Sequence, residues 1–415
     1  MFEYECPGER LSVTAVPVGG SKGETMTVWP RAEPRSAGVH APQIAIELPL
    51  ERVRTWTLIA VWWAASRAIV FGTAFGAQLL RWPRPSWYDA HEQPLALLGA
   101  WDGRWYRMIA TRGYLAVPHH QSDTAFFPLL PLLLRAGRQL GVPFDVTGLV
   151  VANGCLLVAL IALYELNRYW LDDATALRAA IYASLFPIGF VFSMVYPEAI
   201  VLAAFALACL FAVRRKWTAA AVAAVIAGLG RPEAFFLVLP LGALAFHDWR
   251  RVGAMERFRA LTAALAAPAA IAGVSIYQWR LFHDPVAFAS AQKEWGRATS
   301  ADGLQRAVVE LAHSLGTRNQ WLFRDAVFCV VYLVLLVVAL KHNVPRSWIV
   351  AGALMVVLPL WSGSFTSDAR FGLLAIPIYS GLACLTQRRV FDVGARLVCA
   401  FGLFAATATI LLRWP

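Results

Sequence analysis

A carboxylate flanked by aromatic residues is the first group in this sequence that could do chemistry. Asp102 lies in the segment AWDGRW, between Trp101 and Trp105. Tryptophan is enriched where a membrane meets water, and a carboxylate held at such a boundary could serve as a general base. An aspartate that precedes a helix is also a common N-cap. The sequence is compatible with both roles for Asp102.

Two further segments contain acids, and one of them also contains an arginine. Glu198 follows Pro197 in FSMVYPEA, and Arg231 and Glu233 lie in GLGRPEAF. An acid in the first turn of a helix is favoured by the helix dipole, so Glu198 also has a purely structural interpretation. Arg231 could bind phosphate oxygens through a bidentate guanidinium. Alternatively, it could be an anchor whose charge reaches from the lipid to water.

The remaining candidates are scattered along the chain. His283 and Asp284 open a polar stretch that also holds Gln292, Trp295 and Arg297, whereas Asp368 and Arg370 lie in SGSFTSDARFGLL. Arg370 is a second possible phosphate ligand, again with an anchoring alternative. Arg67 lies within an apolar run, where a charge is a functional hypothesis by default, although an acid of another span could also pair with it.

The elements that must position these residues are membrane helices. The chain has 415 residues, of which 59% are hydrophobic and 15% charged, and its mean hydropathy is +0.55. Soluble proteins average about 45–50% apolar and about 25% charged residues, so a water-soluble, disordered or collagen-like chain is excluded. We predict an all-α, polytopic transmembrane bundle of about eleven spans: 55–80, 146–166, 176–195, 198–213, 218–230, 234–247, 260–281, 324–340, 347–361, 371–386 and 393–412.

The net charge of +11 sets the expected orientation and does not indicate a nucleic-acid partner. The basic residues lie in short clusters between apolar runs, as orientation signals do. If the N-terminus is cytoplasmic, every such cluster falls on the cytoplasmic side. The clusters are Arg168; Arg214, Arg215 and Lys216; Arg250, Arg251, Arg257 and Arg259; Lys341 and Arg346; Arg388 and Arg389.

This orientation leaves two long loops outside, residues 81–145 and 283–323. Loops of such length are usually functional. The first contains an amphipathic stretch at 103–113 and an apolar piece at 126–140, both expected to be helices along the outer interface. If 126–140 spanned instead, there would be twelve crossings, against the charge rule. Residues 1–50 are expected to be a disordered cytoplasmic tail without a signal peptide, and residues 51–415 the transmembrane domain.

Several familiar signatures are missing from the sequence. It contains no Walker loop, Rossmann glycine pattern, HExxH or DxD motif, and its six cysteines show no pairing or zinc-ligand spacing. We therefore expect no cofactor and no metal. The outer acids and arginines beside the lipid instead suggest group transfer from a lipid-linked phosphate.

The motifs resemble the PIG-V family, the GPI mannosyltransferase 2 group of the GT-C membrane glycosyltransferases. The resemblance is carried by WDGRWYRMIATRGY (101–114) and TAFFPLLPLLLR (124–135), followed by FPIGFVFSMVYPEA (186–199), GLGRPEAFFLVLPL (228–241) and FHDPVAFASAQKEWGR (282–297). SDARFGLLAIPIY (367–379) is a weaker match. The resemblance covers about 55–412.

The resemblance implies an inverting mannosyltransferase whose donor is polyprenyl-phosphate mannose. The acid of the first outer loop, Asp102, would be the catalytic base. Donor phosphate or substrate would be bound by residues of the same motifs: Arg231, Arg370, Glu198, Trp101, Arg104, His283 and Asp284. The chain departs from the family pattern where Pro197 replaces Ser, where Glu233–Ala234 replaces Asn–Gly, and where Phe371 replaces Tyr. These departures bear on the acceptor more than on the reaction.

Alternatives of other classes remain open at this point. A transporter or flippase for lipid-linked sugars would be expected to show internal repeats and polar groups at mid-membrane, which we do not find. Two further hypotheses are a non-catalytic scaffold of the cell envelope and a GT-C enzyme that uses another polyprenyl-phosphate sugar. The abundance of Ala and Arg over Lys suggests a bacterial plasma-membrane protein, with a lipid, glycan or glycoprotein acceptor.

Overall fold

The computed structural model describes residues 50–80, 94–116, 120–297, 299–317 and 319–412. The expected tail (1–50, but for its last residue) and parts of the first outer loop (81–93 and 117–119) lie outside the described residues. All regular elements that are described are helical, which confirms the all-α prediction. The α-helices are α1 (Leu50–Leu79), α2 (Asp102–Arg112), α3 (Leu129–Gln139), α4 (Phe144–Asn167), α5 (Asp173–Leu185), α6 (Glu198–Val213), α7 (Trp217–Gly230), α8 (Val238–His247), α9 (Ala254–Phe282), α10 (Ala287–Ser290), α11 (Gly303–Thr317), α12 (Gln320–Lys341), α13 (Arg346–Val357), α14 (Asp368–Phe371), α15 (Pro377–Leu385) and α16 (Arg389–Leu412).

Five of the described helices are long and apolar enough to cross a membrane: α1, α4, α9, α12 and α16. A sixth crossing is possible if the segments Asp368–Leu374 and Pro377–Leu385, which meet at an 89° bend, form one broken span. Four shorter apolar helical segments (Glu198–Val213, Trp217–Gly230, Pro232–His247 and Arg346–Ser362) also match expected spans. Ten of the eleven ranges expected from hydropathy thus match helices or helix pairs, and five of these meet the length criterion alone. The remaining range, 176–195, covers α5 and a break after it.

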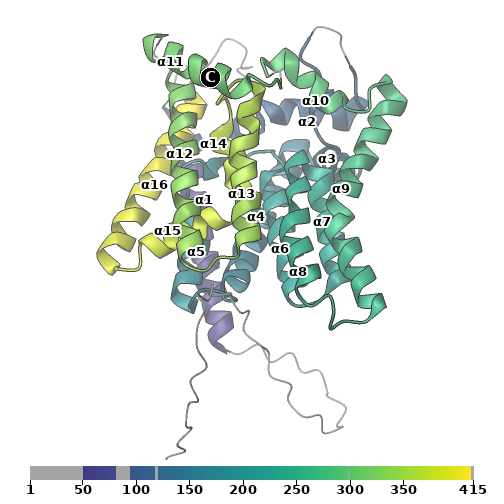
Figure 1. Cartoon of the computed structure of the whole chain (residues 1–415). Coiled ribbons are helices and arrows are strands. Elements are labelled where there is room, and N and C mark those ends of the chain that lie inside the picture. The colour runs from purple at the N-terminus through teal and green to yellow at the C-terminus, as the bar shows by residue number, and fades with distance from the viewer. Residues whose placement is uncertain (1–49, 81–93, 117–119, 298, 318, 413–415) are drawn as a thin grey trace, which may run out of the picture. The chain divides into compact units, whose positions relative to one another are not determined.

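The helices of the transmembrane unit run between two ends of different character (Figure 1). The turns that carry the basic clusters, such as α6–α7 and α8–α9, lie at the end where α1 begins. Ion pairs bind these turns together, since Arg215 contacts both Asp248 and Glu256. Helices α2, α10 and α11 lie at the opposite end. The basic turns therefore lie at the same end of the bundle, as the charge pattern predicts.

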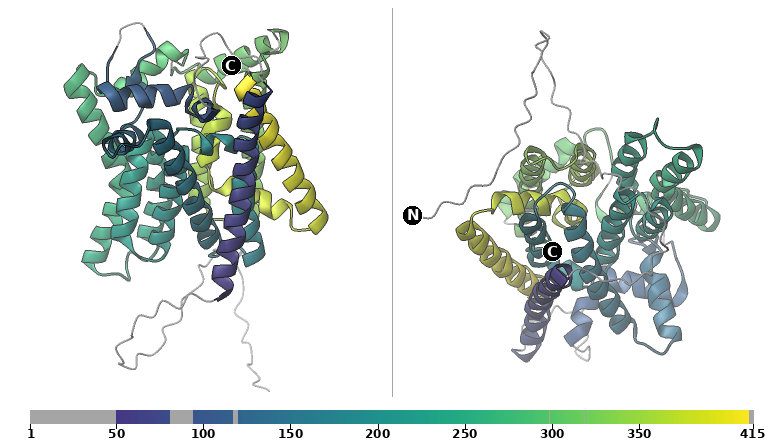
Figure 2. Two further views of the ribbon diagram at one scale, coloured as in Figure 1. Left: turned by 180° about the vertical axis from the view of Figure 1, so that it is seen from behind. Right: turned by 90° about the horizontal axis from the view of Figure 1, so that it is seen from below.

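Helices α2 and α3 lie at the end opposite the basic turns, where α2 runs across the bundle (Figure 2). α2 buries Tyr106, Ile109 and Ala110 and leaves Arg112 exposed, as expected for an amphipathic helix. α3 has only 11 residues, so at 1.5 Å per residue it is about 17 Å long. A hydrocarbon core of about 30 Å is too thick for a helix of this length to cross alone, and α3 is not among the apolar helical segments that match expected spans.

Arg67 does not pair with an acid of another span among the described residues. The helical path is broken after α5, where Phe186 starts an irregular segment that continues into the 3-10 turn η3 (Gly189–Ser193). The Arg67 guanidinium donates to the carbonyls of Ser184 and Gly189 and to the Ser193 hydroxyl, at 3.0, 3.3 and 2.7 Å. No acid pairs with it among the described residues. Arg67 therefore satisfies carbonyl groups that the break leaves without helical partners.

Small residues allow the closest helix contacts. A Cβ placed on Gly381 of α15 would lie 2.0 Å from the backbone oxygen of Leu335 in α12. Only glycine fits this approach, which is how packed membrane helices commonly bring their backbones together. The contact between α12 and α15 fixes the segment that leads from α14, and α14 carries Arg370.

Candidate active site

A cavity of about 630 Å³ opens among the segments at the end of the bundle opposite the basic turns. Its walls combine charged side chains with many apolar ones, including Phe126, Phe190, Trp295 and Trp321. Such a mixture suits a ligand that has a charged head and an apolar part. The charged side chains that line it are Asp102, Arg231, Glu233, Arg297, Arg324, Asp325 and Arg370.

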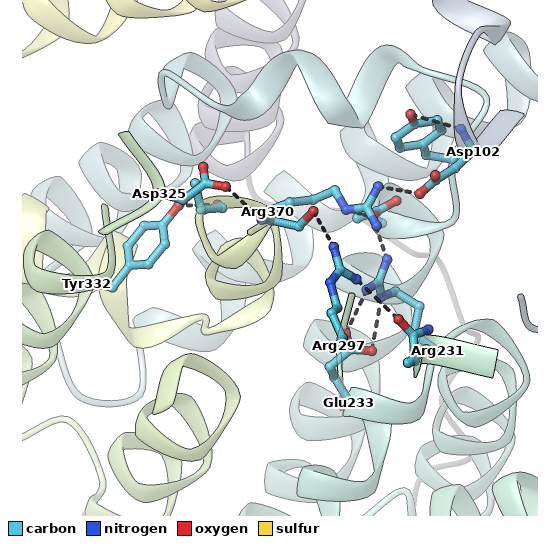
Figure 3. A network of polar contacts seen from close by, with 12 residues as sticks. Asp102, Arg231, Glu233, Arg297, Asp325, Tyr332 and Arg370 are labelled. Atoms are coloured by element: carbon cyan, nitrogen blue, oxygen red, sulfur yellow. Dashed lines mark hydrogen bonds and ion pairs between the residues drawn. The ribbon is translucent and has the colours of Figure 1, made fainter. Parts of the chain in front are cut away.

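Asp102 is bound to Arg370 across 268 residues of sequence (Figure 3). The Arg370 guanidinium donates to Asp102 Oδ2 at 2.5 Å, and the two side chains are 19% and 15% exposed. The backbone amide of Asp102 donates to the Tyr196 hydroxyl at 3.3 Å. Among the described residues, none donates a hydrogen bond to Asp102 Oδ1.

The N-cap interpretation of Asp102 is wrong. Asp102 is the first residue of α2, Trp101 occupies the N-cap position with φ 62°, and no side chain caps this helix end. The carboxylate is bound to Arg370 instead of the backbone of its own helix. Because Trp101 has a positive φ, the chain turns sharply at the point where Asp102 enters the cavity.

Arg231 lies between two carboxylates. It donates to Glu198 Oε1 at 2.5 Å and to Glu233 through two nitrogens, at 3.0 and 2.6 Å. Burial alone would lower the pKa of Arg231, but its attraction to Glu233 and Glu198 outweighs burial and raises this pKa. With 8% of its surface exposed, Arg231 is not an anchor that reaches water.

Glu198 connects Arg231 with Arg370. It is the first residue of α6, as the dipole interpretation expects, and it is 1% exposed. Its Oε1 accepts from Arg231 and also lies 3.2 Å from Arg370 Nε. The carboxylates and guanidiniums of α2, α6, η4 (Pro232–Leu237) and α14 therefore form one connected network.

Three guanidiniums surround the ring of Phe371. Arg231, Arg297 and Arg370 lie 5.3, 5.4 and 5.6 Å from its centroid. Cations at this distance interact favourably with the face of an aromatic ring. Phe371 is the position at which the resembled family has tyrosine, and here the ring separates three cations without adding a hydroxyl.

A second layer of contacts holds the segment that precedes Arg370. Ser367 has φ 70°, a conformation unusual for a residue other than glycine. Its amide donates to Asp325 Oδ2 at 2.7 Å, and the hydroxyl of Tyr332 donates to the Ala369 carbonyl at 2.5 Å (Figure 3). Asp325 is also bound by Arg324, at 2.7 Å. α12 thereby fixes the start of α14.

Aromatic side chains of the outer segments pack over the same region. Trp105 of α2, Phe126 and Trp295 form a mutual cluster with ring centroids 5.7–5.9 Å apart. The buried Gln278 donates to the Thr124 carbonyl at 2.8 Å and accepts from the Phe288 amide at 3.0 Å. These contacts connect α9 and α10 to the first outer loop and place Arg297 at the cavity.

Five of the predicted residues do not line the cavity: Glu198, which pairs with two arginines that do, and Trp101, Arg104, His283 and Asp284. Asp284 Oδ1 accepts from the Val286 amide at 2.9 Å, and His283 ends α9 in a left-handed conformation. Both therefore shape a turn. Trp101 packs against the apolar core, and Arg104 lies outside the cavity lining. The structure thus brings together Asp102, Glu198, Arg231 and Arg370, but not Trp101, Arg104, His283 or Asp284.

Several site residues carried little signal in the sequence. Arg324 and Asp325 stand at the start of an apolar span, and a paired charge there could have indicated a role. Arg297 had no distinctive spacing, because its position depends on the fold of a loop. No cluster of three or more metal-ligating side chains occurs in the described part of the chain.

Comparison with known proteins gives only distant similarity. No family model matches this chain, and no curated protein matches it. The crystal structure of the apo oligosaccharyltransferase of Archaeoglobus fulgidus has a TM-score of 0.47 and 12% identity. The oligosaccharyltransferase AglB of the same archaeon, in complex with an inhibitory peptide and a dolichol-phosphate, has a TM-score of 0.45 and 12% identity.

These alignments cover 87% and 88% of this chain but only 56% of each archaeal protein. The chain therefore spans just over half the length of the proteins it is similar to. A likeness of this degree does not establish a shared activity, and the functional assignment depends on the site.

Proposed function

We propose that this chain is an inverting GT-C glycosyltransferase that moves mannose from polyprenyl-phosphate mannose to a lipid, glycan or glycoprotein acceptor. The observation that carries the proposal is the ion pair of Asp102 with Arg370 in a cavity with apolar walls. A carboxylate with one oxygen held by arginine and the other open has a fixed orientation toward an incoming hydroxyl. Mannose as the sugar, and residues 51–415 as the catalytic domain, follow from the motif resemblance.

In the proposed reaction, Asp102 Oδ1 accepts the proton of the acceptor hydroxyl. The hydroxyl oxygen then forms a bond to the anomeric carbon of the donor sugar. The bond between this carbon and the phosphate oxygen breaks, and polyprenyl phosphate leaves with the electron pair on that oxygen. Attack from the side opposite the leaving group inverts the anomeric configuration. Guanidinium groups near the leaving group stabilise its negative charge.

The placement of the cavity supports a donor whose tail stays in lipid. The cavity lies at the end of the bundle away from the basic turns, close to α2 and α10. If basic turns are cytoplasmic, as in most membrane proteins, the proposed site faces outward. A headgroup at this level would reach the arginines while its chain remains among the helices.

Replacement of Asp102 by Asn tests the proposal. The variant keeps the size of the side chain but cannot accept a proton, so transfer should fall by about 100-fold or more. Membranes from a deletion strain that express either protein would be incubated with radiolabelled decaprenyl-phosphate mannose, and incorporation into lipid and glycan fractions measured.

The matched control is Asp302→Asn, an exposed aspartate on the same end of the molecule that does not line the cavity. It should retain wild-type transfer. Wild-type activity in Asp102→Asn would eliminate Asp102 as the base. If the wild-type protein transfers glucose or arabinose from the corresponding carriers and not mannose, the sugar assignment is replaced while the reaction class remains.

A further inference from the structure

The four arginines that line the cavity are not equivalent. Arg324 is paired with Asp325, Arg231 with Glu198 and Glu233, and Arg370 with Asp102 and Glu198. Arg297 has no carboxylate within ion-pair distance among the described residues. Its two hydrogen bonds go to neutral oxygens, Ser367 Oγ at 2.8 Å and Gln292 Oε1 at 3.3 Å.

The Arg297 guanidinium also has unused bonding capacity. Its Nε is buried and has no hydrogen-bond partner. A guanidinium has five N–H donors in a planar fork, and a buried donor without an acceptor is costly. Burial together with the nearby Arg370 cation lowers the pKa of Arg297 to about 10. The site therefore holds a cation that no carboxylate of the described residues binds directly.

The paired arginines, in contrast, are poorly suited to receive an anion. Asp102, Glu198 and Glu233 are three carboxylates, whereas Arg231 and Arg370 are two guanidiniums. One negative charge is left over in this group. An incoming phosphate would have to displace a carboxylate and would meet repulsion from the others.

We propose that Arg297 is the ligand of the donor phosphate, and that Arg231 and Arg370 position carboxylates. This inference rests on the proposed function and names the group that receives the leaving anion. The fork of Arg297 would bind a phosphate oxygen, while Ser367 and Gln292 hold its other nitrogens. The excess negative charge lies around Asp102, which takes up the proton. Arg297 lies where negative charge develops on the leaving phosphate.

Binding of farnesyl phosphate, with farnesol as the uncharged control, tests this assignment. The full-length protein purified in detergent would be titrated by microscale thermophoresis. We expect the wild type to bind farnesyl phosphate more tightly than farnesol. Arg297→Gln should weaken farnesyl phosphate binding at least tenfold and leave farnesol binding unchanged, and Arg297→Lys should weaken it less.

Two further measurements separate ligand binding from a structural role. Lys293→Gln removes one positive charge from the same loop at an exposed position outside the cavity lining, and should bind like the wild type. The melting temperature of ligand-free Arg297→Gln should be unchanged or higher, because no carboxylate loses its partner. A marked fall in this melting temperature would contradict the proposal.

The outcomes distinguish the two levels of inference. If the wild type transfers mannose and binds farnesyl phosphate, but Arg297→Gln binds it as well as the wild type does, Arg297 is not the ligand and the proposed function stands. If the wild type neither transfers nor discriminates farnesyl phosphate from farnesol, the proposed function fails and the Arg297 assignment with it.

Discussion

At the scale of single residues, the site depends on buried charges that compensate one another. Glu198 and Glu233 are held in an environment with little water by the same guanidinium of Arg231. A buried ion pair contributes modestly to stability when intact, but breaking it leaves an unpaired charge that is costly. Arg231 is therefore more important for stability than its proposed positioning role alone would indicate.

Replacement of Arg231 by Met should lower the free energy of unfolding by about 3–5 kcal/mol, because Glu233 loses its partner and Glu198 loses one of its two. The measurement is the thermal unfolding of the detergent-purified protein. Arg297→Met is the matched comparison, since it removes an equally large arginine that has no carboxylate partner among the described residues. Equal destabilisation of the two variants would argue against the charge pairing seen here.

Which of these residues could be predicted from the sequence depended on their surroundings in the chain. Asp102, Glu198, Arg231 and Arg370 interrupt apolar or aromatic stretches, where an unneeded charge would be costly. Arg297 lies in a polar loop, so its charge is unremarkable until the loop is folded against α14. The motif FHDPVAFASAQKEWGR (282–297) contains His283, Asp284 and Arg297, and the first two were predicted as site residues. A polar loop gives no local indication of which of its side chains faces a cavity.

At the scale of elements, hydropathy located the helices but not their interruptions. The spans expected at 176–195 and 371–386 are each broken, the first by the irregular segment after α5 and the second by the bend before α15. A broken helix needs other partners for its freed carbonyls. These partners come from distant residues such as Arg67, and local sequence does not contain that information.

Replacement of Arg67 by Leu should therefore destabilise the protein by about 2–4 kcal/mol, because at least two carbonyls lose a charged donor inside the bundle. Arg54→Leu, at an exposed position on the same helix, should change the melting temperature little. Detergent-solubilised variants compared by thermal unfolding provide the measurement. If Arg67→Leu melts with the wild type, the guanidinium is not needed to hold the break.

At the scale of the whole transmembrane unit, the two ends differ in their charge and in the elements that they contain. Basic turns occupy one end, and α2, α10, α11 and the cavity occupy the other. We predict that the cavity end is extracytoplasmic. A membrane-impermeant maleimide applied to intact cells should label Asp302→Cys, which is at the cavity end, and should not label Arg251→Cys.

Permeabilised cells supply the control for this labelling, since both cysteines should then react. Background is low because the native cysteines described are buried or partly buried; the unsubstituted protein measures what remains. Labelling of Arg251→Cys alone in intact cells would reverse the orientation and place the proposed site in the cytoplasm.

The long sequence separation of Asp102 and Arg370 has a consequence for biogenesis. The two residues are 268 positions apart, so at typical rates of about 5–20 residues per second the ribosome adds Arg370 roughly 10–50 seconds after Asp102. During this interval the nascent chain has Asp102 but not the arginine that orients it. The proposed site is therefore complete only once α14 has been made, and a chain that terminated before Arg370 would lack the arginine that orients Asp102.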